Sequence, residues 1–145
     1  MGNLASIYLS QGKLNKAEQL YVQVLDMRKK LLGAEHPDTV LSMGNLARIY
    51  ANKGNLKEAE QLEIQALELS KKLSGAENLA THICMANLAR TYADKGNLKE
   101  AEQLEVQVLD MRKKLLGAEH PQTLLSMGNL ASTYLSQGSG MRQSS

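Results

Sequence analysis

Two kinds of apolar pattern alternate along the chain, and both have the spacing of an α-helix. The first kind, in residues 37–52, places one set of apolar residues on a single face: Met43, Leu46, Ala47 and Tyr50. The second kind, in residues 55–74, continues at the same spacing with Leu56, Ala59, Leu62, Ala66, Leu69 and Leu73. Gly54 and Gly75 follow the two segments, and glycine often ends a helix in the left-handed conformation. The pattern therefore predicts antiparallel helix pairs, and no period-two alternation supports a strand.

The helix pair recurs every 42 residues. Four of the five tyrosines stand 42 residues apart, at Tyr8, Tyr50, Tyr92 and Tyr134. Complete units span residues 1–42, 43–84 and 85–126, and residues 127–138 begin a fourth; the first and third units share 30 of 42 residues. We expect an all-α array in which each unit buries its apolar face against the next. This division predicts about three and a half repeats, seven helices and a disordered tail over residues 139–145.

Residues with capping chemistry mark the expected helix starts. Pro37 suits the first turn of a helix because its φ angle is fixed near the helical value. Asn55 and Asn97 are each followed three residues later by a glutamate, which predicts capping boxes at the second helix of the second and third units. Lys13 occupies the same position in the first unit, so we expect the second helix there to start less firmly.

One recurring motif resembles the tetratricopeptide repeat: Met43-x-x-Leu46-Ala47-x-x-Tyr50-x-x-x-Gly54-x-x-x-x-Ala59. It covers residues 1–138. It departs from the family pattern in Glu63 and Glu105, which stand where the second helix usually has Phe, and in eight extra residues that lengthen each helix by about one turn. The segment 32–39 followed by Asn45-Leu46-Ala47 resembles the 42-residue units of kinesin light chains and, more closely, the arrays of fungal STAND-type NTPases. The second unit departs again, with Asn78-Leu79 where the others have His-Pro, and this leaves the start of the next helix open.

The resemblance implies a right-handed α-solenoid that binds a partner protein on a concave face lined by the first helix of each repeat. The residues of those helices that point away from the core stripe are the candidate partner-binding residues: Asn3, Asn45, Arg48, Asn52, Asn87, Arg90, Asp94 and Asn129. Side-chain amides can donate to and accept from a peptide backbone, and arginine can pair with an acidic residue. Two alternatives stay open, because each Asn can instead bond to the neighbouring repeat and each Arg can be an ordinary surface cation.

Composition excludes other classes of function. The net charge of +2 comes from 17 basic and 15 acidic residues that are well mixed, which gives no basic surface for nucleic acid or for an anionic membrane. His36 and His120 lie 84 residues apart and His82 has a different register, so the sequence predicts no metal site. The lone Cys84 lacks a base and an orienting group, and we expect a buried or half-buried structural thiol. We therefore predict a cytoplasmic, non-catalytic scaffold without a cofactor.

Self-assembly is the alternative function. The fourth unit has a first helix but no apolar pattern for a second, and the first unit begins inside a helix. Both ends would then expose surface that stacking normally buries, which predicts end-to-end stacking or domain swapping. Gly2, Gly44 and Gly128 lie inside the first helices, where we expect tight helix packing or the approach of a ligand to explain them.

Overall fold

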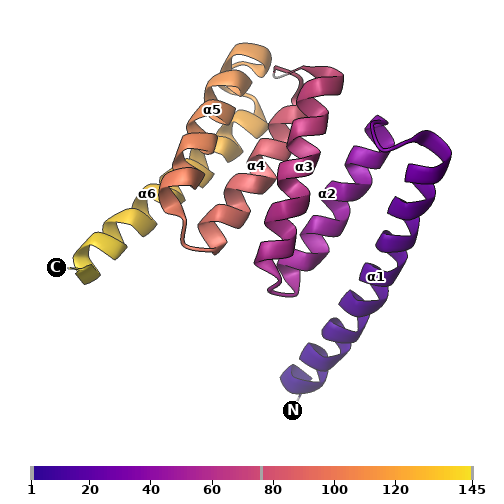
Figure 1. Ribbon diagram of the computed structural model, residues 1–145. Helices are drawn as coiled ribbons and strands as arrows, with labels where there is room; N and C mark the ends of the chain where they lie inside the picture. The colour runs from indigo at the N-terminus through magenta and orange to yellow at the C-terminus, as the bar shows by residue number, and fades with distance from the viewer. Residues whose placement is uncertain (1, 76, 145) are drawn as a thin grey trace. The chain divides into compact units, whose positions relative to one another are not determined.

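The computed structural model describes residues 2–75 and 77–144, and the side chains of residues 12–75 and 77–138. Six helices and no strand occur in these ranges, in the following order (Figure 1): α1 (Gly2–Leu32), α2 (Pro37–Asn52), α3 (Leu56–Ser74), α4 (Leu79–Asp94), α5 (Leu98–Leu116) and α6 (Pro121–Ser144). The chain forms two compact units, Met1–Leu73 with α1 to α3 and Ser74–Ser145 with α4 to α6. The prediction of an all-α chain is confirmed.

The expected number of helices is wrong by one, because the first two predicted helices form the single helix α1. Gly54 and Gly96 adopt positive φ angles of 86° and end α2 and α4, and each is followed by Asn. Gly12 and Gly138 instead lie inside α1 and α6, and Lys13 and Ser139 follow them. Lysine is a poor N-cap, so nothing at Lys13 favours a new helix start over continuing the old one. Residues 139–144, expected to be disordered, continue α6 as well, although Ser139 is of a residue type that favours a new helix start.

Histidine and asparagine side chains cap three of the helix starts. His36 and His120 each accept a hydrogen bond through Nδ1 from the backbone N–H two residues later, at 3.1 Å. Asn78 does the same through Oδ1 at 2.8 Å, which fixes the start of α4 although the His-Pro pair is missing. The capping box expected at Asn97 is wrong: its side chain forms no capping bond, and its ψ of 68° departs from the extended backbone that aims a cap at the helix.

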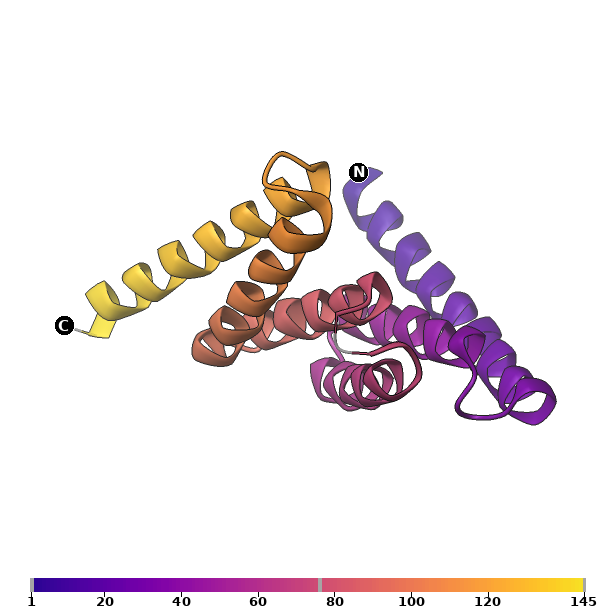
Figure 2. The same cartoon turned by 90° about the horizontal axis from the view of Figure 1, so that it is seen from above.

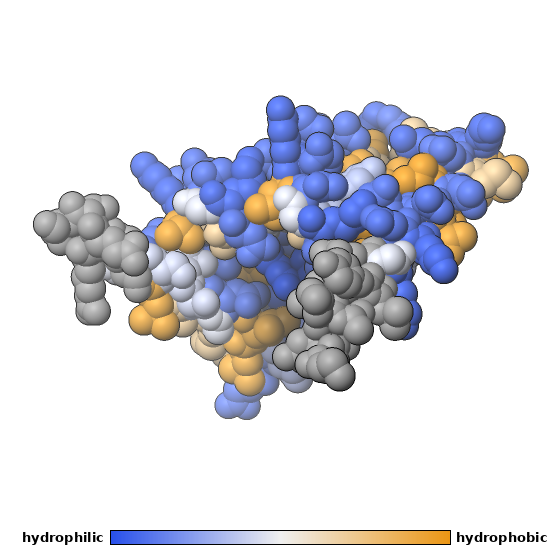
Figure 3. All heavy atoms as spheres, turned by 90° about the horizontal axis from the view of Figure 1, so that it is seen from below, coloured by the Kyte–Doolittle hydropathy of each residue, from blue (hydrophilic) through white to orange (hydrophobic). Residues whose placement is uncertain are grey.

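The core contains part of the predicted stripes: Met43, Leu46, Ala47, Ala59 and Ala66 are buried, whereas Leu73, which was expected with them, is 39 % exposed. In the first unit α1 packs against α2, and Leu25, Met43, Leu46 and Ala47 are buried. In the second unit α5 packs against both α4 and α6, and it buries Ala101 and Val108 between them (Figures 1 and 2). Hydrophobic side chains also reach the surface among hydrophilic ones (Figure 3), and the most exposed of them are Leu31 of α1 and Leu135 of α6. None of the described helices combines the length and the apolarity that crossing a membrane requires.

The glycines inside the first helices are not explained by tight packing. A Cβ added to Gly44 or Gly128 would meet no atom within 4 Å. The expectation of close helix contact is therefore wrong for these two positions, and Gly2 lies outside the described side chains. Gly54 differs, because its positive φ is a conformation that side chains other than glycine rarely adopt.

Alanine substitution should separate these two kinds of glycine. Gly44→Ala should raise the free energy of unfolding by about 1 kcal/mol, the difference in helix propensity. Gly54→Ala should lower it by about 1–2 kcal/mol, because Ala is strained in the left-handed region. Denaturant unfolding followed by circular dichroism measures both. A destabilised Gly44→Ala variant would show that another backbone needs the space.

Candidate binding groove

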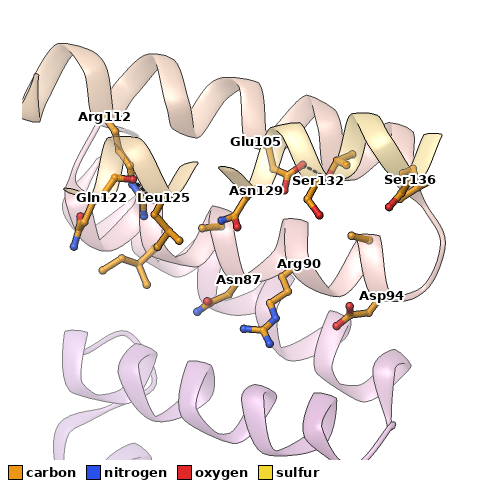
Figure 4. Close-up of a pocket in the computed structure, with 15 residues that line it drawn as sticks. Asn87, Arg90, Asp94, Glu105, Arg112, Gln122, Leu125, Asn129, Ser132 and Ser136 are labelled. Atoms are coloured by element: carbon orange, nitrogen blue, oxygen red, sulfur yellow. Dashed lines mark hydrogen bonds between the residues drawn. The ribbon is translucent and has the colours of Figure 1, made fainter. Parts of the chain in front are cut away.

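A groove of about 590 Å³ lies in the second unit, between α4 and α6 and above α5. Figure 4 shows its polar side chains projecting from all three helices. The lining includes Ile83, Asn87, Arg90 and Asp94 of α4, Glu105 and Arg112 of α5, and Gln122, Leu125, Asn129, Ser132, Thr133 and Ser136 of α6. Ile83 and Leu125 are about half exposed and add apolar surface, and Leu125 lies beside the polar side chains of Arg112 and Gln122 (Figure 4).

The structure brings together four of the eight predicted partner-binding residues. Asn87, Arg90, Asp94 and Asn129 all line this groove (Figure 4). The other described candidates, Asn45, Arg48 and Asn52, lie on α2 in the first unit, where Asn45 and Asn52 are exposed and Arg48 is half-buried. The side chain of Asn3 lies outside the described residues. The groove is therefore a site of the second unit alone.

The groove residues that were predicted have no partners within the described part of the chain. Asn87 and Asn129 form no side-chain hydrogen bond there, and Arg90 and Asp94 form no ion pair although they are four residues apart on one helix. Asn45 on α2 is in the same state among the described residues. Within the second unit, no described residue of the neighbouring repeat bonds to Asn87 or Asn129, and for Asn45 the alternative stays open. These amides and charges remain available to a ligand.

The floor of the groove contains two buried charged residues that the sequence analysis did not place in the site. Glu105 is 8 % exposed and accepts a hydrogen bond from Thr133 Oγ1 at 2.6 Å. Burial raises the pKa of the Glu105 carboxyl, and the bond from Thr133 partly opposes this. The signal for burial was present in the sequence, since Glu105 occupies a position where the family has an apolar core residue.

Arg112 connects the floor to the start of α6. Its Nη1 donates to Ser126 Oγ at 2.6 Å and to the Gln122 carbonyl at 3.3 Å. Burial lowers the pKa of the guanidinium, which stays cationic because an arginine pKa starts so high. Arg28 makes the same connection from α1 to Ser42 of α2, at 2.7 Å. Each of these two arginines therefore connects the end of one helix to the first turns of the next.

Other titratable residues do not form a second site in the described ranges. His82 is fully buried, and burial, with the positive charge of Arg112, lowers its pKa, so the ring is neutral at neutral pH. Cys84 is half-buried, as expected, and forms no disulfide. No group of three histidine, cysteine or acidic side chains is arranged to hold a metal ion among the described residues.

Family models and solved structures agree on the relatives of this fold. Two models of the tetratricopeptide repeat match residues 1–72 and 83–122. The chain belongs to the tetratricopeptide repeat family. The resemblance noted in the sequence is thereby confirmed, and proteins built of these repeats generally mediate contacts between proteins. No curated protein sequence matches the chain significantly.

Three solved structures superpose on nearly the whole chain. The kinesin light chain TPR-like repeats of Podospora anserina, described as nearly identical to one another, share 34% identity with a TM-score of 0.82 over 94% of this chain. A variant of that protein with a single substitution gives the same values. BtubC from P. vanneervenii superposes with a TM-score of 0.80 over 93% of the chain, at 23% identity, which supports the fold alone. This tetratricopeptide chain spans 64% of the first relative and 54% of BtubC.

The buried carboxyl of Glu105 should make stability depend on pH. Its pKa is raised in the folded state, so folding is favoured by the protonated form and the free energy of unfolding falls as pH rises above about 4.5, the ordinary value. Glu105→Gln should remove this fall between pH 5 and pH 7. Thr133→Val should make the fall steeper, because it deletes the bond that stabilises the carboxylate. Denaturation midpoints at the two pH values test both variants, and an unchanged pH dependence in Glu105→Gln would contradict the assignment.

Proposed function

We propose that the groove of the second unit binds an extended segment of a partner protein without catalysing a reaction. The observation that carries this proposal is the pair of unbonded amides, Asn87 on α4 and Asn129 on α6, that face one groove. Asparagine is an indifferent helix former, and these two gain no hydrogen bond from the described residues around them. A ligand would supply the bonds that the protein leaves unmade.

The amide chemistry suits a peptide backbone. Each asparagine side chain can accept one N–H and donate to one C=O, and a main chain in extended conformation presents both groups along its length. Asn87 and Asn129 hold the same place in successive repeats, 42 residues apart. A peptide lying between α4 and α6 would therefore be held from both sides by equivalent groups.

The other lining residues indicate which side chains the peptide carries. Ile83 and Leu125 would contact an apolar side chain, and Arg90 would pair with an acidic one. Seven helical residues separate Ile83 from Arg90, a rise of about 10 Å, which an extended peptide covers in about three residues. Asp94 lies one helical turn beyond and would accept a basic side chain about two residues further on.

The proposal also covers the compartment and the kind of partner. The composition offers no basic surface for nucleic acid, and the single cysteine cannot form a disulfide within the chain. We infer that the scaffold acts in the cytoplasm, with a protein partner and without a metal or cofactor.

The groove can be tested with labelled 12-residue peptides that carry a leucine and, three positions away, either glutamate or lysine. Fluorescence polarisation should show preference for the glutamate peptides. Asn87→Ala combined with Asn129→Ala should weaken binding about tenfold, the loss of two hydrogen bonds. Arg90→Glu should reverse the preference towards lysine, because it inverts the charge that the peptide meets.

Gln103→Ala is the matched control, because this exposed polar residue of α5 does not line the groove. It should bind the peptides like the unchanged chain. Equal circular dichroism spectra would show that every variant is folded. An unchanged affinity in the double Asn variant, together with an unchanged preference for glutamate in Arg90→Glu, would exclude this groove.

A second candidate function is self-association. Apolar side chains stay exposed along one face of α1 and one face of α6, and they include Val24 and Met127, whose repeat equivalents in the inner helices are buried. This observation is independent of the groove.

A further inference from the structure

One face of α1 lacks the cover that the equivalent faces of α3 and α5 have. Val24 is 39 % exposed, whereas Ala66 and Val108 at the same repeat position are 2 % exposed. The residues of this face, hereafter the α1 stripe, are Leu20, Val24, Met27 and Leu31, which are all exposed. At the position of Leu31 the other helices are open as well, since Leu73 and Leu115 are 39 % and 50 % exposed. The last three of them line a hollow of about 440 Å³. In α5 the matching face packs against α4, the first helix of the same repeat. In α1 that partner is absent from the described residues, because the helix continues straight through Gly12.

The complementary face is exposed on α6. Met127 is 38 % exposed, whereas Met43 and Met85 at the same repeat position are 3 % and 1 % exposed. The residues of this face, hereafter the α6 stripe, are Leu124, Met127, Ala131 and Tyr134. In α4 the matching face packs against α5, and no described residue covers it in α6 in the same way.

The two stripes are the two halves of one repeat contact. The α6 stripe has the register of the α4 face that packs on α5, and the α1 stripe has the register of the α5 face that packs on α4. Residues 127–138 also repeat residues 1–12 with one difference, Thr133 in place of Ile7. Thus α6 carries the same residues that immediately precede residues 13–32, the part of α1 with the bare stripe. The contact between α4 and α5 is a template for joining them.

The geometry points to a second copy of this chain as the occupant: the α6 stripe of one copy docks on the α1 stripe of another. This inference rests on the second proposed function, self-association, and specifies which residues of the two helices meet. Because α4 ends at Asp94 and α5 begins at Leu98, residues equally far from this turn lie side by side, so Met127 would lie near Val24 and Leu124 near Met27. The contact is head-to-tail, since it joins two different faces.

Two complementary variants test this arrangement. Val24→Glu puts a charge in the α1 stripe, and Ala131→Glu puts one in the α6 stripe, both at positions open to solvent in the single chain. The unchanged chain should sediment with a mass that rises with concentration. Each variant alone should sediment as a 15.9 kDa monomer, because every possible contact would then contain one charged stripe. An equimolar mixture should form a 1:1 heterodimer, in which the intact α6 of one variant docks on the intact α1 of the other.

Leu125→Glu is the control, because Leu125 is exposed on α6 but faces the groove. It should associate like the unchanged chain, so a loss of peptide binding and a loss of association can be told apart. A strictly monomeric unchanged chain would overturn the proposal. Self-association of either single variant would also overturn it, since that requires a contact between two α1 stripes or two α6 stripes, or a different surface.

Discussion

The second helix of each repeat has two apolar faces and needs a partner for each, and the rest of the structure follows from that requirement. Helix α5 has both partners, and Ala101 and Val108 are buried between α4 and α6. Among the described residues helix α1 packs on α2, and Leu25 is buried while Val24 stays exposed. An amphipathic helix gains most of its stability from packing, so an exposed apolar stripe leaves that stabilisation unrealised until another helix packs on it.

Polar contacts determine how one repeat meets the next. Arg28 and Arg112 each donate a hydrogen bond to a serine of the following helix, so the same bond recurs two 42-residue repeats apart. The position two turns earlier differs, because Glu105 in α5 meets Thr133 while Tyr21 occupies the same place in α1. A buried carboxyl without a donor would be costly, so Glu105 needs a hydroxyl on the helix it faces. Such polar pairs make each helix prefer one particular neighbouring helix, whereas the apolar stripes of different repeats are nearly the same.

Sequence reasoning succeeded where a residue has one dominant local effect. Pro37 began α2 and Gly54 ended it as expected, because both act through their own backbone angles. It failed where two local effects compete: Gly12 resembles Gly54, yet Lys13 supplies no cap, and the helix continues. The groove was half predictable. Helical spacing put Asn87 and Arg90 on one face, but only the packing of α5 shows that buried charged side chains form the floor beneath them.

Helix α6 presents its two functional faces in different directions. The groove residues of α6 include Leu125, Asn129, Ser132 and Ser136, whereas the α6 stripe consists of Leu124, Met127, Ala131 and Tyr134. Neighbouring residues of a helix are turned by about 100°, so the two sets share the helix without sharing a surface. A second copy docked on the α6 stripe would therefore leave the groove open. Assembly would then multiply the groove along a chain of copies, and a partner with several equivalent segments would bind such a chain more tightly than one copy.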